Sequence, residues 1–427
     1  MSVKKIEIKG SYNKTGRLLG ESHKYILKSI EEKVIKNIKI EKEKIKRYDE
    51  FFKKFSPLGE EIEGYCNGAD IKFENLLKLK FGSFKILKNS CTSLFLSSKF
   101  FVENVPICLK IRDQFPLPQY ICKKQNEDKT PYFFSGSISD IGYGFFIKEN
   151  GFVGINNTGS FLKEEFVNEY GIDDCDVMRV VAEYCNKIEE AIEIIKRLQG
   201  DKIIGYTGKR RGMIFLFVEK EKPFYIEMNS FNLNIKKIED VWSFTNDFLL
   251  RKSQDWIKNE QTEGTKSSKI RKKRIDEILN ENKKFDLKNL IEISRDKKYY
   301  PYSICRDTKL MPVRTVSAFI AILNEDPIVW VCLGQPYISP FFQFFVKGNK
   351  IIENFVSGDI SIKIDMIFEK KQLNDEKYLD EIRNFEKDLN DKIDRIKNLE
   401  EKNIEIQKYV FHFIKKEGNE SLYNTRP

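Results

Sequence analysis

The chain has 427 residues, of which 41% are hydrophobic and 33% are charged. This length and composition exclude a disordered chain, a collagen and a disulfide-stapled mini-protein, and they allow one large domain or two of ordinary size. The sequence contains no apolar stretch of about 18 residues, and its first residues alternate between apolar and charged. We therefore expect a soluble, cytoplasmic protein with neither a membrane-spanning helix nor a signal peptide.

The formal charge of +10 is concentrated at one end of the chain. Residues 1–54 hold 16 Lys and Arg against 8 Asp and Glu, so they carry a net +8 and leave about +2 for the rest. Lys and Glu mixed on one helix usually form a solvated face, and no later segment concentrates positive charge. We expect neither nucleic acid nor a membrane as a partner.

The eight cysteines and two histidines limit the chemistry. No Cys-x-x-Cys is present, so we expect the cysteines to be reduced and not to bind zinc. His23 and His412 both lie in charged, helix-like terminal segments, which disfavours a Cys-His or Ser-His-Asp catalytic site. Two histidines also exclude a metal site with several histidine ligands. We expect no metal ion and no cofactor.

The first 90 residues have mainly helical periodicity. Residues 4–9 predict a short strand, and apolar residues at helical spacing predict one helix over about 22–55, ended by Ser56-Pro57-Leu58-Gly59. Further helices are expected near 59–66 and 73–81. We therefore expect this block to form a helical, basic leader that is separable from the rest of the chain.

After residue 90 the pattern changes to strands rich in aromatic and β-branched residues. The expected strands are 91–96, 105–110, 132–137, 144–148, 151–156, 213–219, 223–228, 241–245, 314–323 and 327–333. The expected helices are 174–199, 266–281 and 286–295, followed by one long amphipathic helix over about 374–415. The apolar seam of this last helix is expected to pack on its own domain, and the alternative is a homo-oligomer in which it pairs with a second copy. Blocks of helices and strands in this order predict an α+β fold built in layers.

Cys91 lies where the helical block ends and the strand block begins, in the sequence Asn89-Ser90-Cys91-Thr92-Ser93. A single cysteine is usually a small apolar side chain that enters a core. This one opens a strand, precedes two hydroxyl residues and follows a separable block, which are the requirements of an N-terminal nucleophile. Cleavage before Cys91 frees an α-amino group with a reference pKa of about 8. That amine can take the proton of the thiol without a histidine.

Three further strands end in polar residues. Asp113 ends a strand that a hairpin returns to the neighbourhood of Cys91, where it can accept a hydrogen bond from the cysteine amine or amide; a surface ion pair with the preceding arginine is the alternative. Asn156 and Asn157, in a glycine-rich strand, can donate to a substrate oxygen or form an ordinary turn. Asn246 follows an apolar strand, and its amide can donate to a developing oxyanion or end the strand in a turn.

Together these segments resemble the N-terminal-nucleophile (Ntn) amide hydrolases typified by the fungal acyl-CoA:isopenicillin N acyltransferases, with bile-salt hydrolases and penicillin V acylases as more distant relatives. Cys91-Thr92-Ser93 is similar to the family's Cys-Thr-Ser/Thr, Leu109-Lys110-Ile111-Arg112-Asp113 to Gly-x-Asn-x-Asp, and Thr245-Asn246-Asp247-Phe248 to Thr-Asn-His-Phe. In the bile-salt branch an arginine stands where Lys110 does. Weaker matches follow the family's order at 57–69, 149–157, 268–271 and 332–336. Ser90 replaces a glycine that often precedes the nucleophile, and Asp247 replaces a histidine.

The resemblance implies a four-layer αββα Ntn-hydrolase sandwich. It implies a leader of residues 1–90 removed by autocatalysis, a core over 91–370 and a helical extension over 371–427. It also implies that Cys91 takes an acyl group from a small N-acyl or peptide-like metabolite, either an amide or a thioester, and passes it to water or an amine. The enzyme would then be a linear amide C–N hydrolase or an N-acyltransferase.

The resemblance also implies roles for the other residues. Asp113 would orient the amine of the nucleophile, Asn246 would form the oxyanion hole, and Asn157 would help to bind the intermediate. The alternative function is a catalytically silent relative that acts as a binding or assembly protein through its terminal helices. A nucleic-acid binder that works through the basic leader is the third and least favoured hypothesis.

Overall fold

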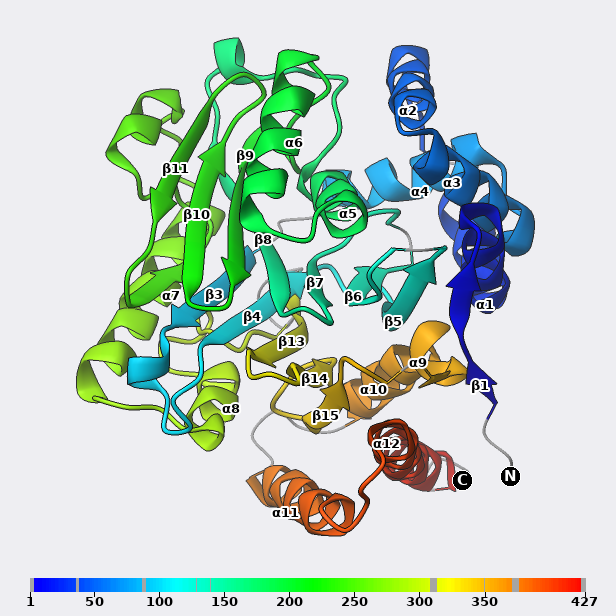
Figure 1. The fold of residues 1–427 in the computed structure, drawn as a ribbon, viewed down its shortest axis with the longest axis vertical. Coiled ribbons are helices and arrows are strands. Elements are labelled where there is room, and N and C mark those ends of the chain that lie inside the picture. The colour runs from blue at the N-terminus through cyan, green and yellow to red at the C-terminus, as the bar shows by residue number, and fades with distance from the viewer. Residues whose placement is uncertain are drawn as a thin grey trace.

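Two β-sheets form the centre of the computed structural model (Figure 1). The structure describes residues 4–35, 38–86, 90–127, 129–138, 140–307, 313–348, 350–370 and 376–423. The sheet pairs within these ranges are antiparallel, except for the parallel pair β2–β5. The expected α+β class is therefore confirmed.

The six-stranded sheet has the order β12-β3-β4-β13-β14-β15. Its strands are β3 (Ser90–Leu96), β4 (Ile107–Gln114), β12 (Val241–Phe244), β13 (Arg314–Ile322), β14 (Ile328–Leu333) and β15 (Phe342–Phe345). Five of them lie close to the predicted ranges, because their β-branched and aromatic runs suit a sheet buried on both faces. The short strand β15 has no counterpart among the predicted elements.

The eight-stranded sheet has the order β11-β10-β9-β8-β7-β6-β5-β2. Its strands are β2 (Ile8–Gly10), β5 (Gln119–Asn126), β6 (Tyr132–Ser137), β7 (Phe145–Lys148), β8 (Phe152–Phe161), β9 (Arg211–Glu219), β10 (Lys222–Met228) and β11 (Leu233–Lys237). The prediction missed β5 and β11. Lysine and asparagine interrupt the apolar pattern of both strands, and this hides them from periodicity alone.

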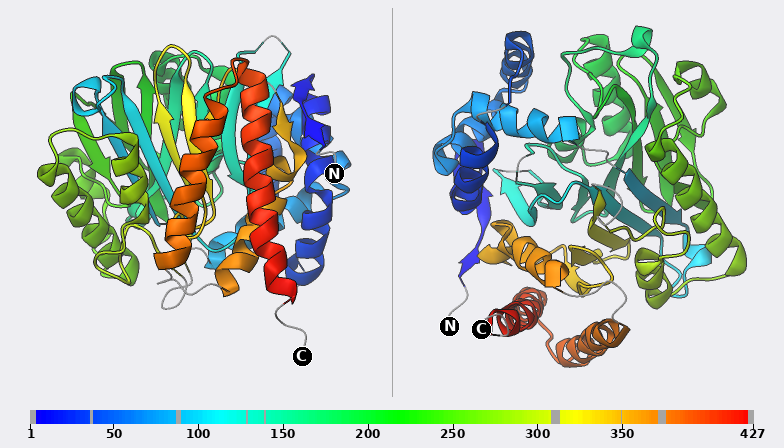
Figure 2. Two further views of the ribbon diagram at one scale, coloured as in Figure 1. Left: turned by 90° about the horizontal axis from the view of Figure 1, so that it is seen from below. Right: turned by 180° about the vertical axis from the view of Figure 1, so that it is seen from behind.

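The two sheets pack face to face, and helices cover their outer faces (Figures 1 and 2). Between the sheets, the rings of Phe145 and Phe319 stack at 5.0 Å. Helices α7 (Glu263–Glu281) and α8 (Leu287–Arg295) pack their apolar sides on the outer face of the six-stranded sheet. Helices α5 (Asp174–Tyr184) and α6 (Ile188–Gly200) cover the other sheet, so the layers run helix, sheet, sheet, helix.

Two predicted helices are divided in the structure. The helix expected over 22–55 is α1 (Tyr12–Val34) and α2 (Lys42–Lys54), because α2 turns to bury Tyr48. The helix expected over 174–199 divides at Cys185, whose backbone is extended. The helix that was expected to stop at Ser56-Pro57-Leu58-Gly59 ends at Lys54, but these four residues begin α3 (Ser56–Ala69), which therefore starts earlier than expected. Proline lacks an N–H, and the first turn of a helix does not need one.

The leader block packs into the core rather than beside it. Strand β2 extends the eight-stranded sheet, and β1 (Lys5–Ile6) pairs with β16 (Ile351–Ile352). Glu61 of α3 lies 2.7 Å from Lys124 of β5 and 3.1 Å from Arg179 of α5, and all three are buried. Lys80 of α4 (Phe73–Ile86) contacts Asp173 at 2.8 Å. The leader therefore completes buried charge networks of the core.

The prediction of one long helix over 374–415 is wrong. The structure instead has two helices there, α11 (Glu376–Ile393) and α12 (Leu399–Tyr423), and they follow the shorter helices α9 (Glu353–Val356) and α10 (Asp359–Lys370). Asn398 accepts a hydrogen bond from the Glu401 amide, which starts α12 separately, and the rings of Phe385 and Phe413 stack at 4.2 Å across the resulting hairpin. Most of the apolar seam, such as Tyr378, Ile382 and Leu389, is buried within the chain, in keeping with the expected packing on its own domain. The expected boundary at 370/371 adjoins residues outside the described ranges.

None of the helices in the described part of the chain is long and apolar enough to span a membrane.

Candidate functional site

Cys91 is the second residue of β3 and is almost completely buried, with 5% of its surface exposed. In the sheet register, Cys91 lies opposite Arg112 of β4, and Ser93 lies opposite Lys110. Because side chains alternate along a strand, these four share the inner face of the six-stranded sheet, toward the eight-stranded sheet. Asn89, which precedes them in the sequence motif, lies outside the described residues.

The backbone of Cys91 is held on both sides. Its N–H donates to Asn246 Oδ1 at 2.8 Å, and its carbonyl oxygen accepts from Arg271 Nη1. Arg271 comes from α7, is completely buried, and also donates to Asn246 Oδ1 at 2.9 Å. Burial lowers the pKa of Arg271 to about 10. The start of β3, the end of β12 and α7 are therefore joined at Cys91.

Asn246 is the centre of this hydrogen-bond network. Its Nδ2 donates to the Thr158 carbonyl at 2.8 Å, and its backbone N–H donates to Ser268 Oγ at 3.0 Å. Arg211, at the start of β9, donates to the Asn246 carbonyl at 3.2 Å. The structure thus brings Asn246 to Cys91, with the carboxamide oxygen directed to the cysteine amide.

Asn157 and Lys110 lie on the inner face near Cys91. Asn157 Oδ1 accepts from Lys110 Nζ at 2.6 Å and from Ser93 Oγ at 2.9 Å, while its Nδ2 donates to the Thr245 carbonyl at 2.8 Å. Lys110 Nζ also donates to the Asn156 carbonyl. Burial lowers the pKa of Lys110. Sequence reasoning did not select Lys110 as a functional residue, although a lysine between Leu109 and Ile111 in a buried strand was a signal for one.

Asp113 ends β4 and is completely buried. Its Oδ1 accepts from Thr315 Oγ1 at 2.7 Å, and its Oδ2 lies 3.9 Å from Arg306 Nη1. Burial raises the pKa of Asp113, and the positive charges of Arg306 and Arg271 oppose this rise. Strand alternation places its side chain on the outer face, opposite to that of Cys91. In the uncleaved chain the cysteine amide is bonded to Asn246 instead of Asp113.

A cavity of about 740 Å³ lies between the leader and the core. Aromatic side chains and charges of both signs line it: Lys39, Ile40, Glu41, Lys44, Phe81, Phe161, Leu162, Glu164, Glu169, Tyr170, Asp173, Tyr206, Gly208, Lys209, Arg210, Lys258 and Glu260. Cys91 is not among the lining residues. Arg211 contacts both the cavity and the hydrogen-bond network at Cys91. Its guanidinium lies 4.8 Å from the ring of Phe161, which lines the cavity, and it donates to the Asn246 carbonyl.

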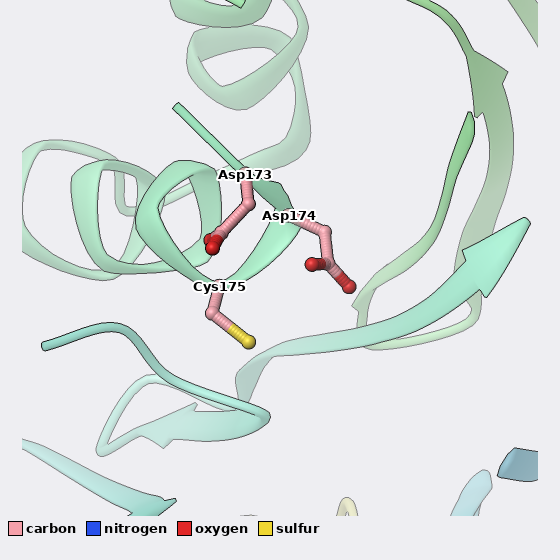
Figure 3. Close-up of side chains that lie close together, drawn as sticks. All are labelled: Asp173, Asp174 and Cys175. Atoms are coloured by element: carbon pink, nitrogen blue, oxygen red, sulfur yellow. The ribbon is translucent and has the colours of Figure 1, made fainter. Parts of the chain in front are cut away.

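Within the described residues, Asp173, Asp174 and Cys175 form a group whose residue types could hold a metal ion, since their ligand atoms lie within 4.8 Å of one another. Figure 3 shows them at the start of α5. Protein groups already engage them: Asp173 caps α5 and contacts Lys80, and Asp174 accepts from Thr207 Oγ1 at 2.6 Å. The ammonium group of Lys80 thus supplies a positive charge beside Asp173.

The chain belongs to the acyl-coenzyme A:6-aminopenicillanic acid acyl-transferase family, whose sequence model matches residues 116–337, more than half of the 427 residues. This confirms the family resemblance. The matched range contains Asn157, Asn246 and Arg271, and it begins after Cys91 and Asp113. Linear amide hydrolysis or acyl transfer is thus the chemistry that family membership indicates.

Solved structures of low similarity complete the comparison. A mutant of the conjugated bile acid hydrolase from Clostridium perfringens has 13% identity and a TM-score of 0.37, covering 60% of this chain and 92% of that one. A Caenorhabditis elegans ortholog of N-acylethanolamine-hydrolyzing acid amidase has 12% identity and a TM-score of 0.36, covering 54% and 92%. These similarities are too distant to assign residue roles. No protein of curated function matches the sequence.

Proposed function

We propose that this protein is an Ntn-type cysteine amidohydrolase or acyltransferase with Cys91 as its nucleophile. Family membership supports the class, and the helix–sheet–sheet–helix layering suits an αββα Ntn-hydrolase sandwich. The observation that carries the proposal is the environment of Cys91. A buried cysteine opens a central strand, with its amide held by Asn246 and its carbonyl by Arg271.

Neither histidine serves Cys91 in this arrangement. His23 bonds Tyr65 and the Val356 carbonyl, both at 2.8 Å, and His412 lies on the C-terminal helix α12 beside Phe411. An N-terminal α-amine then supplies the base, as it can for a nucleophile exposed by cleavage. The proposed enzyme therefore consists of residues 1–90 and a chain that begins at Cys91.

In the proposed reaction, the Cys91 thiolate attacks the carbonyl carbon of an amide or thioester, and the amine or thiol of the substrate leaves. The resulting thioester passes its acyl group to water or to an amine. Asn246 stabilises the oxyanion, Asp113 orients the α-amine and Asn157 helps to bind the intermediate. Asn246 already contacts the Cys91 nitrogen, whereas Asp113 must reach it from the opposite face.

We place the substrate in the cavity between leader and core. Its volume of about 740 Å³ suits a small molecule, and Phe81, Phe161 and Tyr206 offer apolar surface for an acyl group. The charged side chains around them suit a peptide-like compound with polar ends. The cavity is adjacent to the Cys91 network through Arg211.

Denaturing intact-mass measurement tests the proposal. Wild-type protein is expected to give fragments of residues 1–90 and 91–427, while Cys91→Ala stays whole. Cys66→Ala is the control, because Cys66 lies in α3, away from the network, and this variant is expected to be cleaved like wild type. Cleavage of Cys91→Ala at the same bond would contradict an autocatalytic role.

A silent binding protein remains the second candidate, because the leader is embedded in the core and an uncleaved leader would stay in place. Labelling with iodoacetamide separates the two functions. The enzyme predicts alkylation of Cys91 once its amine is exposed, and a Cys91 that stays unreactive after cleavage supports the silent protein.

A further inference from the structure

Lys110 is buried without a carboxylate partner. Only 1% of its surface is exposed, and Nζ donates to the Asn156 carbonyl and to Asn157 Oδ1. Within the part of the chain that the structure describes, it forms no ion pair, unlike buried Lys80 and Lys124. A neutral lysine amine has two hydrogens, which it can donate to these two acceptors. Its lone pair can then accept a proton from a third neighbour.

That third neighbour is Cys91. Both side chains lie on the inner face of the six-stranded sheet, diagonally across the β3–β4 pair. Such positions are about 7–8 Å apart at Cα, within the reach of a lysine. The Cys91 side chain lies close enough to raise the pKa of Lys110 against the effect of burial. The amine therefore lies beside the thiol in the uncleaved chain.

Several cations surround this pair. Arg112 lies next to Lys110, and the charges of Arg211, Arg271 and Arg306 reach Cys91.

Two carboxylates also lie near this pair. Asp174 of α5 faces Lys110, and Asp113 lies at the end of the same strand as Lys110. Burial lowers the pKa of Lys110, which favours its neutral form.

We infer that Lys110 is the proton acceptor for Cys91 while the leader is still attached. This inference rests on the proposed function and adds to it, because before cleavage the Cys91 nitrogen is an amide bonded to Asn246 and is no base. The free amine exists only after the leader is cut. Lys110 therefore serves the first reaction of the chain, cleavage of its own Ser90–Cys91 bond.

Cleavage of the Ser90–Cys91 bond consumes one water molecule. Lys110 Nζ takes the proton of the Cys91 thiol, and Sγ attacks the carbonyl carbon of Ser90. The C–N bond breaks, and the Lys110 ammonium returns the proton to the Cys91 nitrogen. Water then hydrolyses the Ser90–Sγ thioester and releases the Ser90 carboxylate, the Cys91 thiol and its free amine.

Refolding from denaturant tests this inference in the full chain. Wild type, Lys110→Met and Lys110→Arg are refolded between pH 5 and 9, and cleavage is followed by intact mass. Iodoacetamide labelling of Cys91 in the uncleaved fraction is located by peptide mass. The matched control is Lys148→Met, since Lys148 is another buried lysine, with a pKa lowered to about 8, but contacts Asn186 on the opposite side of the eight-stranded sheet.

Lys110→Met is expected to slow cleavage about 100-fold, as loss of a general base does. Its residual rate keeps rising with pH, whereas the wild-type rate levels off once Lys110 is neutral. Lys110→Arg places a permanent positive charge beside Cys91, so iodoacetamide is still expected to alkylate Cys91. Cleavage is expected to be slower, because a guanidinium does not accept the thiol proton. Lys148→Met is expected to cleave at the wild-type rate.

Cleavage of Lys110→Met at the wild-type rate, with the wild-type pH profile, would overturn the role of Lys110 and leave the proposed function intact. If wild type is neither cleaved nor alkylated at Cys91, the proposed function and this inference both fail. If wild type is alkylated but not cleaved, an unchanged alkylation profile in Lys110→Met refutes the inference. Circular dichroism verifies folding, and Lys110→Gln replaces the methionine variant if that variant does not fold.

Discussion

Asn246 is the side chain on which the candidate site is built. Its carboxamide oxygen accepts from both Cys91 and Arg271, and its nitrogen donates to Thr158 on the facing sheet. One amide thus fixes the backbone of Cys91, a buried cation and the neighbouring strand. Removal of this amide leaves the Cys91 N–H and the Arg271 guanidinium without their shared acceptor.

Asn246→Ala is therefore expected to lower the rate of leader cleavage by about 10²–10³, the usual effect of losing an oxyanion-hole donor. The rate is measured by intact mass during refolding. Asn234→Ala is the control, because Asn234 lies on the edge strand β11 and its side chain donates to Ser253 Oγ at 2.9 Å. A wild-type cleavage rate in Asn246→Ala would remove Asn246 from the proposed machinery.

At the level of single residues, the sequence selected Cys91, Asp113, Asn157 and Asn246, and three of these meet in one network. Asp113 does not join it in the uncleaved chain, because one step along a strand moves a side chain to the other face. Lys110 and Arg211 were missed for a different reason. A lysine in an apolar strand was a local signal for Lys110, but the partners of both residues are dozens of positions away in the sequence, so no local pattern shows what they contact.

Helices α1 and α3 cross at unusually close range. A Cβ on Gly64 would lie 2.1 Å from the Asn13 carbonyl oxygen, and one on Gly16 would lie 2.0 Å from the Glu61 carbonyl oxygen. Glycines four residues apart on both helices, at 16 and 20 and at 64 and 68, form the contact. This spacing was readable in the sequence, and it explains how the leader stays a tight helical pair.

Gly64→Ala is expected to lower the free energy of unfolding by about 3 kcal/mol, since the added methyl meets backbone that does not move aside. Urea unfolding measures this loss. Gly200→Ala at the end of α6 is the matched control, because a Cβ there meets nothing within 4 Å and alanine favours a helix. Equal stability of the two variants would show that the crossing tolerates a side chain.

Among the elements, the strands were predicted better than the helix ends. Apolar runs long enough to cross a buried sheet are local signals, as in β9 and β13. The breaks at Cys185 and between α11 and α12 depend on where each helix must turn to bury its apolar side. The apolar periodicity of the sequence continues through such a break, because the helices on both sides use the same residue types. The periodicity therefore does not show where one helix ends and the next begins.

The leader and the core form one folded unit across the expected cleavage point. Leader helix α1 places His23 against Tyr65 of α3 and the Val356 carbonyl of α9. His23 is completely buried, and this burial lowers its pKa to about 4. The two fragments are therefore expected to remain together after cleavage, held partly by a histidine that must stay neutral.

This burial makes stability depend on pH. The unfolded chain binds a proton on His23 below pH 6.5, while the folded chain binds it only near pH 4. Stability from this group is complete above pH 6.5 and falls as the pH drops toward 4, by about 3 kcal/mol over the window. In urea unfolding at several pH values, His23→Gln is expected to lose this dependence, and exposed His412→Gln is expected to keep it. An identical pH profile for His23→Gln and wild type would contradict the assignment.

The sequence by itself determined the class of fold and the family, and it selected Cys91 as the proposed nucleophile. Each depends on a local pattern: apolar alternation, a short motif, or a cysteine at the border of two blocks. Only the tertiary structure decided what surrounds Cys91 and how the leader is used. The partners of Lys110, the face of Asp113 and the burial of Glu61 against Lys124 all depend on strand register and helix docking, which join residues far apart in the chain. These contacts follow from global packing, and no short stretch of sequence contains them.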